Sequence, residues 1–382
     1  MSGYKSPWMD DDLGIFRSSV RQFMREEFVP HEARWREQHR VDREAWLKAG
    51  EMGILLTDIP EEYGGGGGTF AHECVVLEEM GYAGVTSFGN SVQSIIAHYL
   101  LAYGMEEQNR KWLPGMAEGR IVAALAMTEP GAGSDLQAIR TTAVRRDDHY
   151  VINGSKTFIT NGYHADLICL AAQTDQTQKG AKGISLIMVE VKDLQGYAVG
   201  RTLEKIGQQG QDTCEIFFDD VRVPASNLLG TDEGKGFAQM MKQLPFERTL
   251  VGVIAVAVME RAVAITTRYA KERKMFGKTL LDLQNTRFKL AECKTEAHIA
   301  RVFIDNCIQQ LIAGTLDTAT AAMAKWWLTD KQFQIADECL QLHGGYGYMT
   351  EYEISRIWTD SRVQRIYGGA NEVMKELVAR SL

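Results

Sequence analysis

Met127-Thr-Glu-Pro-Gly-Ala-Gly-Ser-Asp135 follows a short apolar run and places a proline and two glycines ahead of a hydroxyl and a carboxylate. Glycine lets another group approach the backbone closely, so this loop offers free amides to the ring carbonyls or the pyrophosphate of a bound ligand. A plain turn has a similar composition, so the pattern alone leaves both interpretations open.

The character of the sequence changes at this loop. From Asp10 to Ile121, apolar residues recur at helical spacing, as in Leu13, Phe16 and Val20, which predicts a helical domain over residues 1–122. Five successive glycines, Gly64 to Gly68, interrupt it. They predict an exposed or ligand-contacting loop, with a flexible loop as the favoured interpretation.

Short β-type runs bounded by turn residues follow the loop and predict a middle β domain over residues 123–230, built as a small antiparallel sandwich or barrel. These runs are 150–154, 167–170, 184–189 and 214–218. Long amphipathic patterns then predict a C-terminal four-helix bundle over residues 231–382. Its helices are expected at about 246–274, 283–312, 317–342 and 370–379. The predicted fold class is therefore α+β.

Composition excludes several classes of function. A net charge of −8 and a pI near 5.6 disfavour a nucleic-acid-binding protein. The six cysteines form no C-x-x-C pair, so we expect reduced, buried thiols and no metal site. The richest apolar stretch, Leu250 to Met259, is too short to span a bilayer. Because the N-terminus also lacks a recognisable targeting signal, we expect a cytoplasmic protein.

Five motifs together resemble the acyl-CoA dehydrogenase family, in the order that this family has them. They are TEPGAGSD at 128–135, FITNG at 158–162, ERKMFG at 272–277, QLHGG at 341–345 and IYGGANE at 366–372. The resemblance covers essentially the whole chain. It implies FAD as cofactor, an acyl-CoA thioester as substrate and an electron-transferring flavoprotein as electron acceptor.

The resemblance also implies which residues bind FAD. In the same subunit, Phe158 would stack on the flavin, in a position that is often Trp in the family. The other residues implied within that subunit are Leu125, Met127, Thr128, Gly133, Ser134 and Thr160. Residues implied to reach the FAD of a neighbouring subunit, or to form the family's further nucleotide-contacting loops, are Arg273, Phe276, Gln284, Gln341, Gly344, Gly345, Ala370, Asn371 and Glu372. Contacts across subunits imply a homotetramer, built as a dimer of dimers.

The catalytic base departs from the common family pattern. That pattern is Tyr-Glu-Gly-Thr, whereas this chain has Tyr367-Gly-Gly-Ala370. The segment Leu244-Pro-Phe-Glu-Arg248 is similar to the long-chain and isovaleryl branch, whose base lies on the long helix of the C-terminal domain. The resemblance therefore implies Glu247 as the base. Without it, Glu247 would be interpreted as a carboxylate at a helix start beside Pro245.

The remaining roles follow from this branch. The amide of Gly368 is expected to stabilise the thioester oxygen as the α-proton leaves and the β-hydride passes to the flavin. Ser134, Arg248, Tyr367 and Gly368 are expected to bind substrate, which we expect to carry a long, methyl-branched or terpenoid acyl group. Three alternatives are an acyl-CoA oxidase, a DNA-associated alkylation-response flavoprotein and a catalytically inert scaffold.

Overall fold

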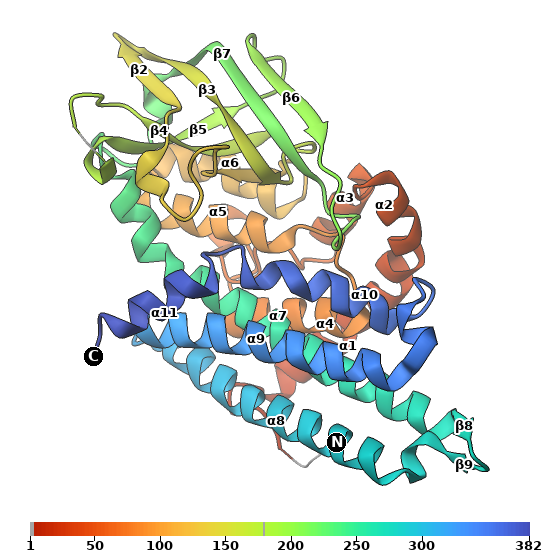
Figure 1. Ribbon diagram of the computed structural model, residues 1–382. Coiled ribbons are helices and arrows are strands. Elements are labelled where there is room, and N and C mark those ends of the chain that lie inside the picture. The colour runs from red at the N-terminus through yellow and green to blue at the C-terminus, as the bar shows by residue number, and fades with distance from the viewer. Residues whose placement is uncertain (1–3, 179) are drawn as a thin grey trace.

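The computed structural model describes residues 4–178 and 180–382. The sheet domain lies above the helices in the view of Figure 1. The chain enters through the helices, crosses to the sheet and returns to the helices. The predicted order of a helical domain, a β domain and a second helical domain is confirmed.

The N-terminal domain is helical throughout, and its first helix begins where Asp10 caps the amide of Leu13 at 2.8 Å. Its helices are α1 (Asp11–Phe23), α2 (Glu32–Gln38), α3 (Arg43–Glu51), α4 (Phe70–Ala83), α5 (Asn90–Tyr103) and α6 (Glu106–Ala117). α4 is buried on almost every side because it packs on both α1 and α7.

The glycine run before α4 is ordered, so the expectation of a flexible loop was wrong. The amides of Gly66 and Gly68 donate to the carbonyls of Leu56 and Thr57 at 3.1 and 2.9 Å. A Cβ on Gly65 would lie 2.2 Å from the carbonyl oxygen of Ile59. The glycines are needed because two segments of backbone approach each other closely.

The middle domain is one mixed sheet, in the order β1-β4-β2-β3-β7-β6 with β5 on the other edge of β4. Its strands are β1 (Ala123–Ala126), β2 (Thr142–Arg146), β3 (His149–Thr160), β4 (Leu167–Gln173), β5 (Ile184–Glu190), β6 (Tyr197–Thr202) and β7 (Thr213–Pro224). The expectation of a purely antiparallel domain was wrong, because β1 pairs with β4 in parallel. All four predicted runs lie within strands, namely β3, β4, β5 and β7.

The C-terminal domain is built on α7 (Gly236–Glu272), a helix of 37 residues. α7 begins ten residues before the predicted start and contains Pro245 in its interior, so Glu247 does not lie at a helix start. The remaining elements are β8 (Lys274–Met275), β9 (Lys278–Thr279), α8 (Gln284–Ile312), α9 (Thr318–His343), α10 (Glu353–Ser361) and α11 (Asn371–Ala379). The sequence interpretation missed the short helix α10.

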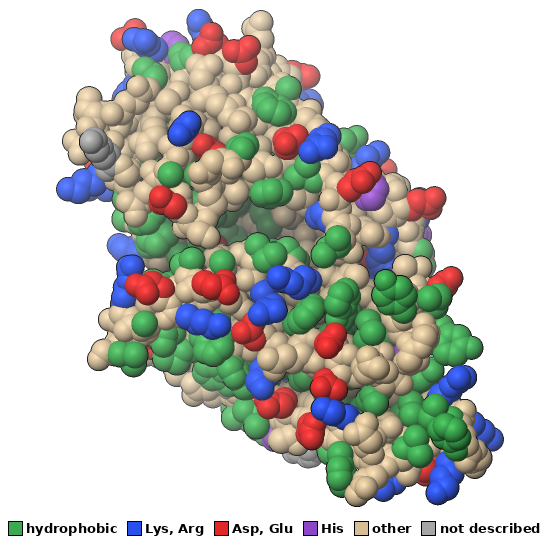
Figure 2. Space-filling view, in the orientation of Figure 1, with side chains coloured by type: hydrophobic (Ala, Val, Ile, Leu, Met, Phe, Trp, Pro, Cys, Tyr) green, Lys and Arg blue, Asp and Glu red, His purple; other side chains and the backbone are tan. Residues whose placement is uncertain are grey.

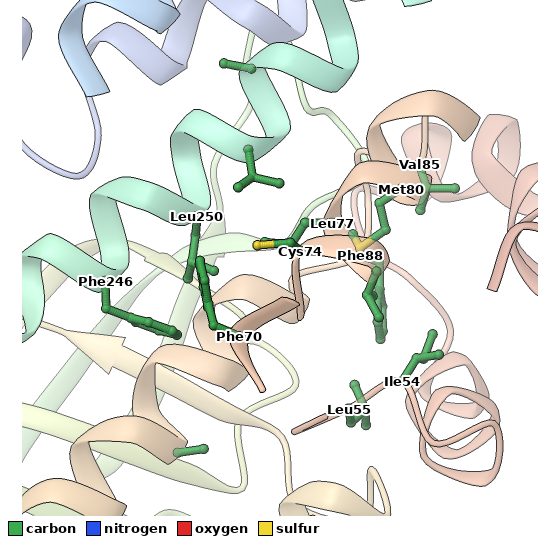
Figure 3. Close-up of a cluster of buried hydrophobic side chains, with 14 of the residues drawn as sticks. Ile54, Leu55, Phe70, Cys74, Leu77, Met80, Val85, Phe88, Phe246 and Leu250 are labelled. Atoms are coloured by element: carbon green, nitrogen blue, oxygen red, sulfur yellow. The ribbon is translucent and has the colours of Figure 1, made fainter. Parts of the chain in front are cut away.

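α7 forms the centre of the molecule. Among the described residues it is the one helix long and apolar enough to cross a membrane by length and composition, but most of its apolar window is buried. It packs against α4, α8 and α9. Figure 3 shows Phe246 and Leu250 of α7 beside Phe70 and Leu77 of α4. A buried core helix satisfies the same criteria as a membrane span. The six cysteines are free and buried, as expected.

Candidate active site

A cavity of about 520 Å³ lies where the three domains meet, within the range of small-molecule sites. Figure 2 shows a hollow between the sheet domain and the helices below it, with hydrophobic side chains inside. Seven of the predicted site residues line the cavity: Leu125, Met127, Phe158, Thr160, Glu247, Tyr367 and Gly368. They come from β1 and the residue that follows it, from β3 and α7, and from the loop before α11.

Glu247 is a buried carboxyl group in this wall. From the described residues its side chain accepts one hydrogen bond, from the hydroxyl of Tyr99 to Oε1 at 2.8 Å, and Tyr99 is itself fully buried. Burial raises the pKa of Glu247 to about 7, while the Tyr99 hydrogen bond and the charge of Arg248 act in the opposite direction. Glu247 is therefore able to exchange a proton near neutral pH.

Three other carboxyl groups line the cavity in the described residues, and each is held by other groups. Glu32 accepts hydrogen bonds from the amides of residues 86 and 87 and pairs with Arg36. Glu353 pairs with Arg261. Asp360 accepts hydrogen bonds from the Thr86 hydroxyl and from the backbone amide of residue 208. Among these four carboxyl groups, Glu247 is the one whose hydrogen-bond partner in the described residues is a single neutral hydroxyl.

The loop before α11 lines the same cavity as Glu247 and contains two glycines in left-handed conformation, with φ of +62° at Gly368 and +91° at Gly369. The fully buried Lys325 on α9 holds this turn, because its ammonium donates to the carbonyl of Gly369 at 2.6 Å and to Oδ1 of Asn371 at 2.9 Å. Burial lowers the pKa of Lys325 to about 7. The position of the Gly368 amide therefore depends on a lysine that the sequence interpretation missed.

The other wall of the cavity is fixed by an ion pair. Lys156 on β3 lies 2.9 Å from Oε1 of Glu129 and donates to the carbonyl of Met127 at 2.9 Å. Glu129 also accepts from the amides of Arg140 and Thr141 at 2.6 and 2.9 Å. Glu129, the glutamate of the 128–135 motif, therefore attaches its own loop to strand β3 of the sheet.

Phe158 stands out from this wall. The register of β3 against β7 shifts between Lys156 and Ile159, and Phe158 takes a left-handed backbone with φ of +60°. Its side chain lines the cavity yet is 66% exposed. A strained aromatic residue with a free face is a site for stacking a flat ring.

Several predicted residues lie beside the cavity or behind its wall. Gly133 and Ser134 are in an exposed turn, and Thr128 is half-buried beneath it. Arg248 is buried, and its Nε and Nη1 have no hydrogen-bond partner in the described residues. It is not among the lining residues, and its expected role in substrate binding stays a prediction.

A second group of predicted residues gathers at the far end of the bundle. Figure 1 shows the β8–β9 hairpin at the corner farthest from the sheet. Arg273 lies next to this hairpin, 5.3 Å from the ring centroid of Tyr346, and Phe276 at its tip is 89% exposed. The predicted residues at the adjoining helix ends are Gln284, Gln341, Gly344 and Gly345. Within one chain none of them lines the cavity.

The third group begins α11 and consists of Ala370, Asn371 and Glu372. The side chain of Asn371 is buried, accepts from Lys325 and donates to Thr329 and Asp330 at 3.0 Å. The side-chain amide of Asn371 therefore forms its hydrogen bonds with residues of its own chain.

The fold and the cavity define an enzyme of three domains that surrounds a buried carboxyl group. Family models of the acyl-CoA dehydrogenase N-terminal, middle and C-terminal domains match residues 10–120, 124–221 and 234–382. The chain therefore belongs to the acyl-CoA dehydrogenase family.

The chain is 47% identical over 370 residues to the mitochondrial long-chain specific acyl-CoA dehydrogenase of Sus scrofa, covering 96% of this chain and 86% of that protein. An acyl-CoA dehydrogenase structure from Geobacillus kaustophilus is 44% identical with a TM-score of 0.96, covering 99% of both chains. A glutaryl-CoA dehydrogenase from Mycobacterium smegmatis in complex with FADH2 is 27% identical with a TM-score of 0.91, covering 98% of this chain and 95% of that one.

The family is FAD-dependent in general, and the residues present fit this group. The free face of Phe158 offers a stacking surface, and Met127 and Thr160 place polar backbone and hydroxyl groups beside it in the same cavity. The residues that would hold the ring are therefore those that line the sheet side of the cavity.

Proposed function

We propose that this enzyme oxidises an acyl-CoA thioester to the trans-2-enoyl-CoA, with Glu247 as the general base and an electron-transferring flavoprotein as the final electron acceptor. The observation that carries the proposal is the state of Glu247, which is a buried carboxyl group with a pKa of about 7 in the cavity wall. A positioned base of this kind contributes about 10² to 10⁴ to the rate.

The chain's own groups perform the proton chemistry. Glu247 takes the α-proton, and the electron pair of that C–H bond forms the new double bond as the β-hydrogen leaves with its own pair. FAD, when bound, supplies the acceptor for that hydrogen and its electron pair. The amide of Gly368 is available to donate to the thioester oxygen while charge develops on it, and the apolar wall excludes water.

A long or branched acyl group fits the shape of the wall. Apolar residues continue along α7 from Glu247 to Val258 through Leu250, Val251 and Ile254. Eleven residues of helix correspond to about 16 Å, enough for an extended acyl chain. The absent side chain at Gly368 leaves additional room near the reacting carbons, which supports methyl-branched or terpenoid acyl groups as well as straight ones.

A homotetramer would complete the cofactor site. The residues at the end of the bundle carry the family's cofactor motifs without reaching the cavity of their own chain. The same end of the bundle also has an exposed aromatic surface, formed by Phe276, Phe288 and Tyr348, which are exposed by 89%, 57% and 83%. Burial of this surface against a second copy would explain both features. Sedimentation of the FAD-loaded protein tests this, and a monomer that retains FAD contradicts it.

The central experiment is Glu247→Gln, which keeps size and polarity but cannot accept the proton. We expect FAD and acyl-CoA to bind normally while anaerobic loss of flavin absorbance slows at least about 10²-fold. FAD content and thermal unfolding serve as controls for folding. Reduction at the wild-type rate would refute the role of Glu247.

The acceptor is tested with the wild-type enzyme. Turnover is compared with an electron-transferring flavoprotein and with oxygen as acceptors, using one long-chain and one branched acyl-CoA. The proposal expects the flavoprotein to be the faster acceptor. Equal rates with oxygen would assign the enzyme to the oxidases.

A further inference from the structure

Tyr99 lies outside the set of residues that the sequence motifs identify, yet it makes the one hydrogen bond that the described residues give to the Glu247 carboxylate. It belongs to α5 in the N-terminal domain, and Glu247 belongs to α7 in the C-terminal domain. The two residues are 148 positions apart in the chain. Tyr99 is fully buried and is not among the residues that line the cavity.

The geometry distinguishes the two oxygens of the carboxylate. Oε1 accepts the Tyr99 hydroxyl at 2.8 Å. Oε2 accepts no hydrogen bond from the described residues, and Glu247 forms part of the cavity wall. Because the Tyr99 hydroxyl holds Oε1, Oε2 is left as the acceptor for a proton from the cavity. The same hydrogen bond limits rotation of the carboxylate about the Cγ–Cδ bond.

We propose that Tyr99 is a positioning residue for the base: its hydroxyl holds Oε1 of Glu247 so that Oε2 is the oxygen that removes the α-proton. This inference rests on the proposed role of Glu247. Tyr99 acts through the carboxylate, since it does not itself reach the cavity.

The charges around Glu247 support this role. Burial raises the pKa of Glu247, and the Tyr99 hydrogen bond lowers it. The other groups near the carboxylate are Arg248 on the same helix, which also lowers the pKa of Glu247, and Cys169 on β4. Burial raises the pKa of Cys169 to about 12, so this thiol is neutral. Burial, together with the charge of Glu247, also raises the pKa of Tyr99, which therefore remains a donor.

The test is Tyr99→Phe, which removes the hydroxyl and keeps the ring. Without the donor, the ionised form of Glu247 is less favoured, so the pKa of Glu247 rises. We expect the midpoint of the rising limb in the pH profile for flavin reduction to increase by about one pH unit or more, because hydrogen bonds to charged groups are the stronger ones. At a pH below the limb, an increase of about one pH unit in this midpoint lowers the rate about tenfold.

Tyr103→Phe is the matched control. Tyr103 lies one turn further along α5 and donates to the carbonyl of Gln239 at 3.2 Å instead of to a carboxylate. This variant loses a hydroxyl from the same helix and should keep the wild-type pH profile.

A second readout does not depend on turnover. The infrared band of the protonated Glu247 carboxyl, identified by its absence in Glu247→Gln, is titrated in protein without substrate. We expect its midpoint to move upward in Tyr99→Phe and to stay in place in Tyr103→Phe. If Tyr99→Phe leaves the midpoint of the pH profile and the midpoint of the infrared titration at their wild-type values, the inference is overturned. That result is distinct from failure of the proposed function, which would appear as wild-type reduction in Glu247→Gln.

Discussion

Returning a carboxylate to position 368 should restore part of the activity of a chain that has lost the Glu247 carboxylate. The perturbation is Gly368→Glu in the Glu247→Gln background. A Cβ at Gly368 would meet only Val251 Cγ2 at 3.7 Å and Lys325 Cε at 3.9 Å, which are ordinary contacts. The new side chain therefore has space, and the nearby Lys325 side chain, in its protonated form, would favour the ionised form of the new carboxyl group.

The cost of this change comes from the backbone. Gly368 has φ of +62°, a conformation that costs a residue with a side chain about 1 to 2 kcal/mol. We expect the free energy of unfolding to fall by that amount. By the proposed role of Glu247, Glu247→Gln should remove about 10² to 10⁴ in rate, and the restored carboxylate should return at least about tenfold with a straight-chain acyl-CoA. Branched acyl groups should gain less, because the new side chain fills the space beside the reacting carbons.

The assay is anaerobic loss of flavin absorbance after mixing with acyl-CoA. Gly368→Ala in the same background is the control, because it carries the same backbone strain and no carboxylate. If the glutamate and alanine double variants reduce flavin at equal rates, the reasoning about the free space at position 368 is refuted.

Two further predictions concern the Glu129–Lys156 ion pair and the end of the helical bundle. Lys156→Met removes the partner of the buried Glu129 carboxylate and should lower the free energy of unfolding by about 3 to 5 kcal/mol. Urea unfolding measures this change. A loss under about 1 kcal/mol would show that the backbone amides alone satisfy Glu129. Arg273→Ala removes the guanidinium at the end of the bundle. If this residue reaches the FAD of a neighbouring subunit in the proposed tetramer, the variant should bind FAD about tenfold or more weakly, while acyl-CoA binding changes little. Titration of apoprotein with FAD measures this, and an unchanged FAD affinity would mean that Arg273 does not contact the cofactor.

The sequence predicted the elements that have a strong local signal. The helices α8 and α9 and the strands β4 and β5 carry regular apolar patterns, and their predicted bounds agree closely with the structure. β6 was missed because its residues are mostly exposed or half-buried and show no alternation. The start of α7 was misplaced because Pro245 indicates a helix boundary, whereas the surrounding packing keeps it inside the helix.

The site residues also differ in whether a local sequence signal identifies them. Glu247, Phe158 and Gly368 could be named because they lie in motifs of adjacent residues. Tyr99 and Lys325 could not, because their importance comes from partners 148 and 44 positions away. The glycine run at 64–68 shows the limit of composition, since the same five residues fit a flexible loop and a tightly hydrogen-bonded one.

The cavity wall takes residues from Val29 at one extreme and Gly368 at the other, so no domain holds the site by itself. A domain separated from the other two would therefore carry only part of the cavity wall, even where it kept its native structure. The shape of the cavity therefore depends on how the three domains pack together, so a substitution at a domain boundary can alter the site without replacing a lining residue.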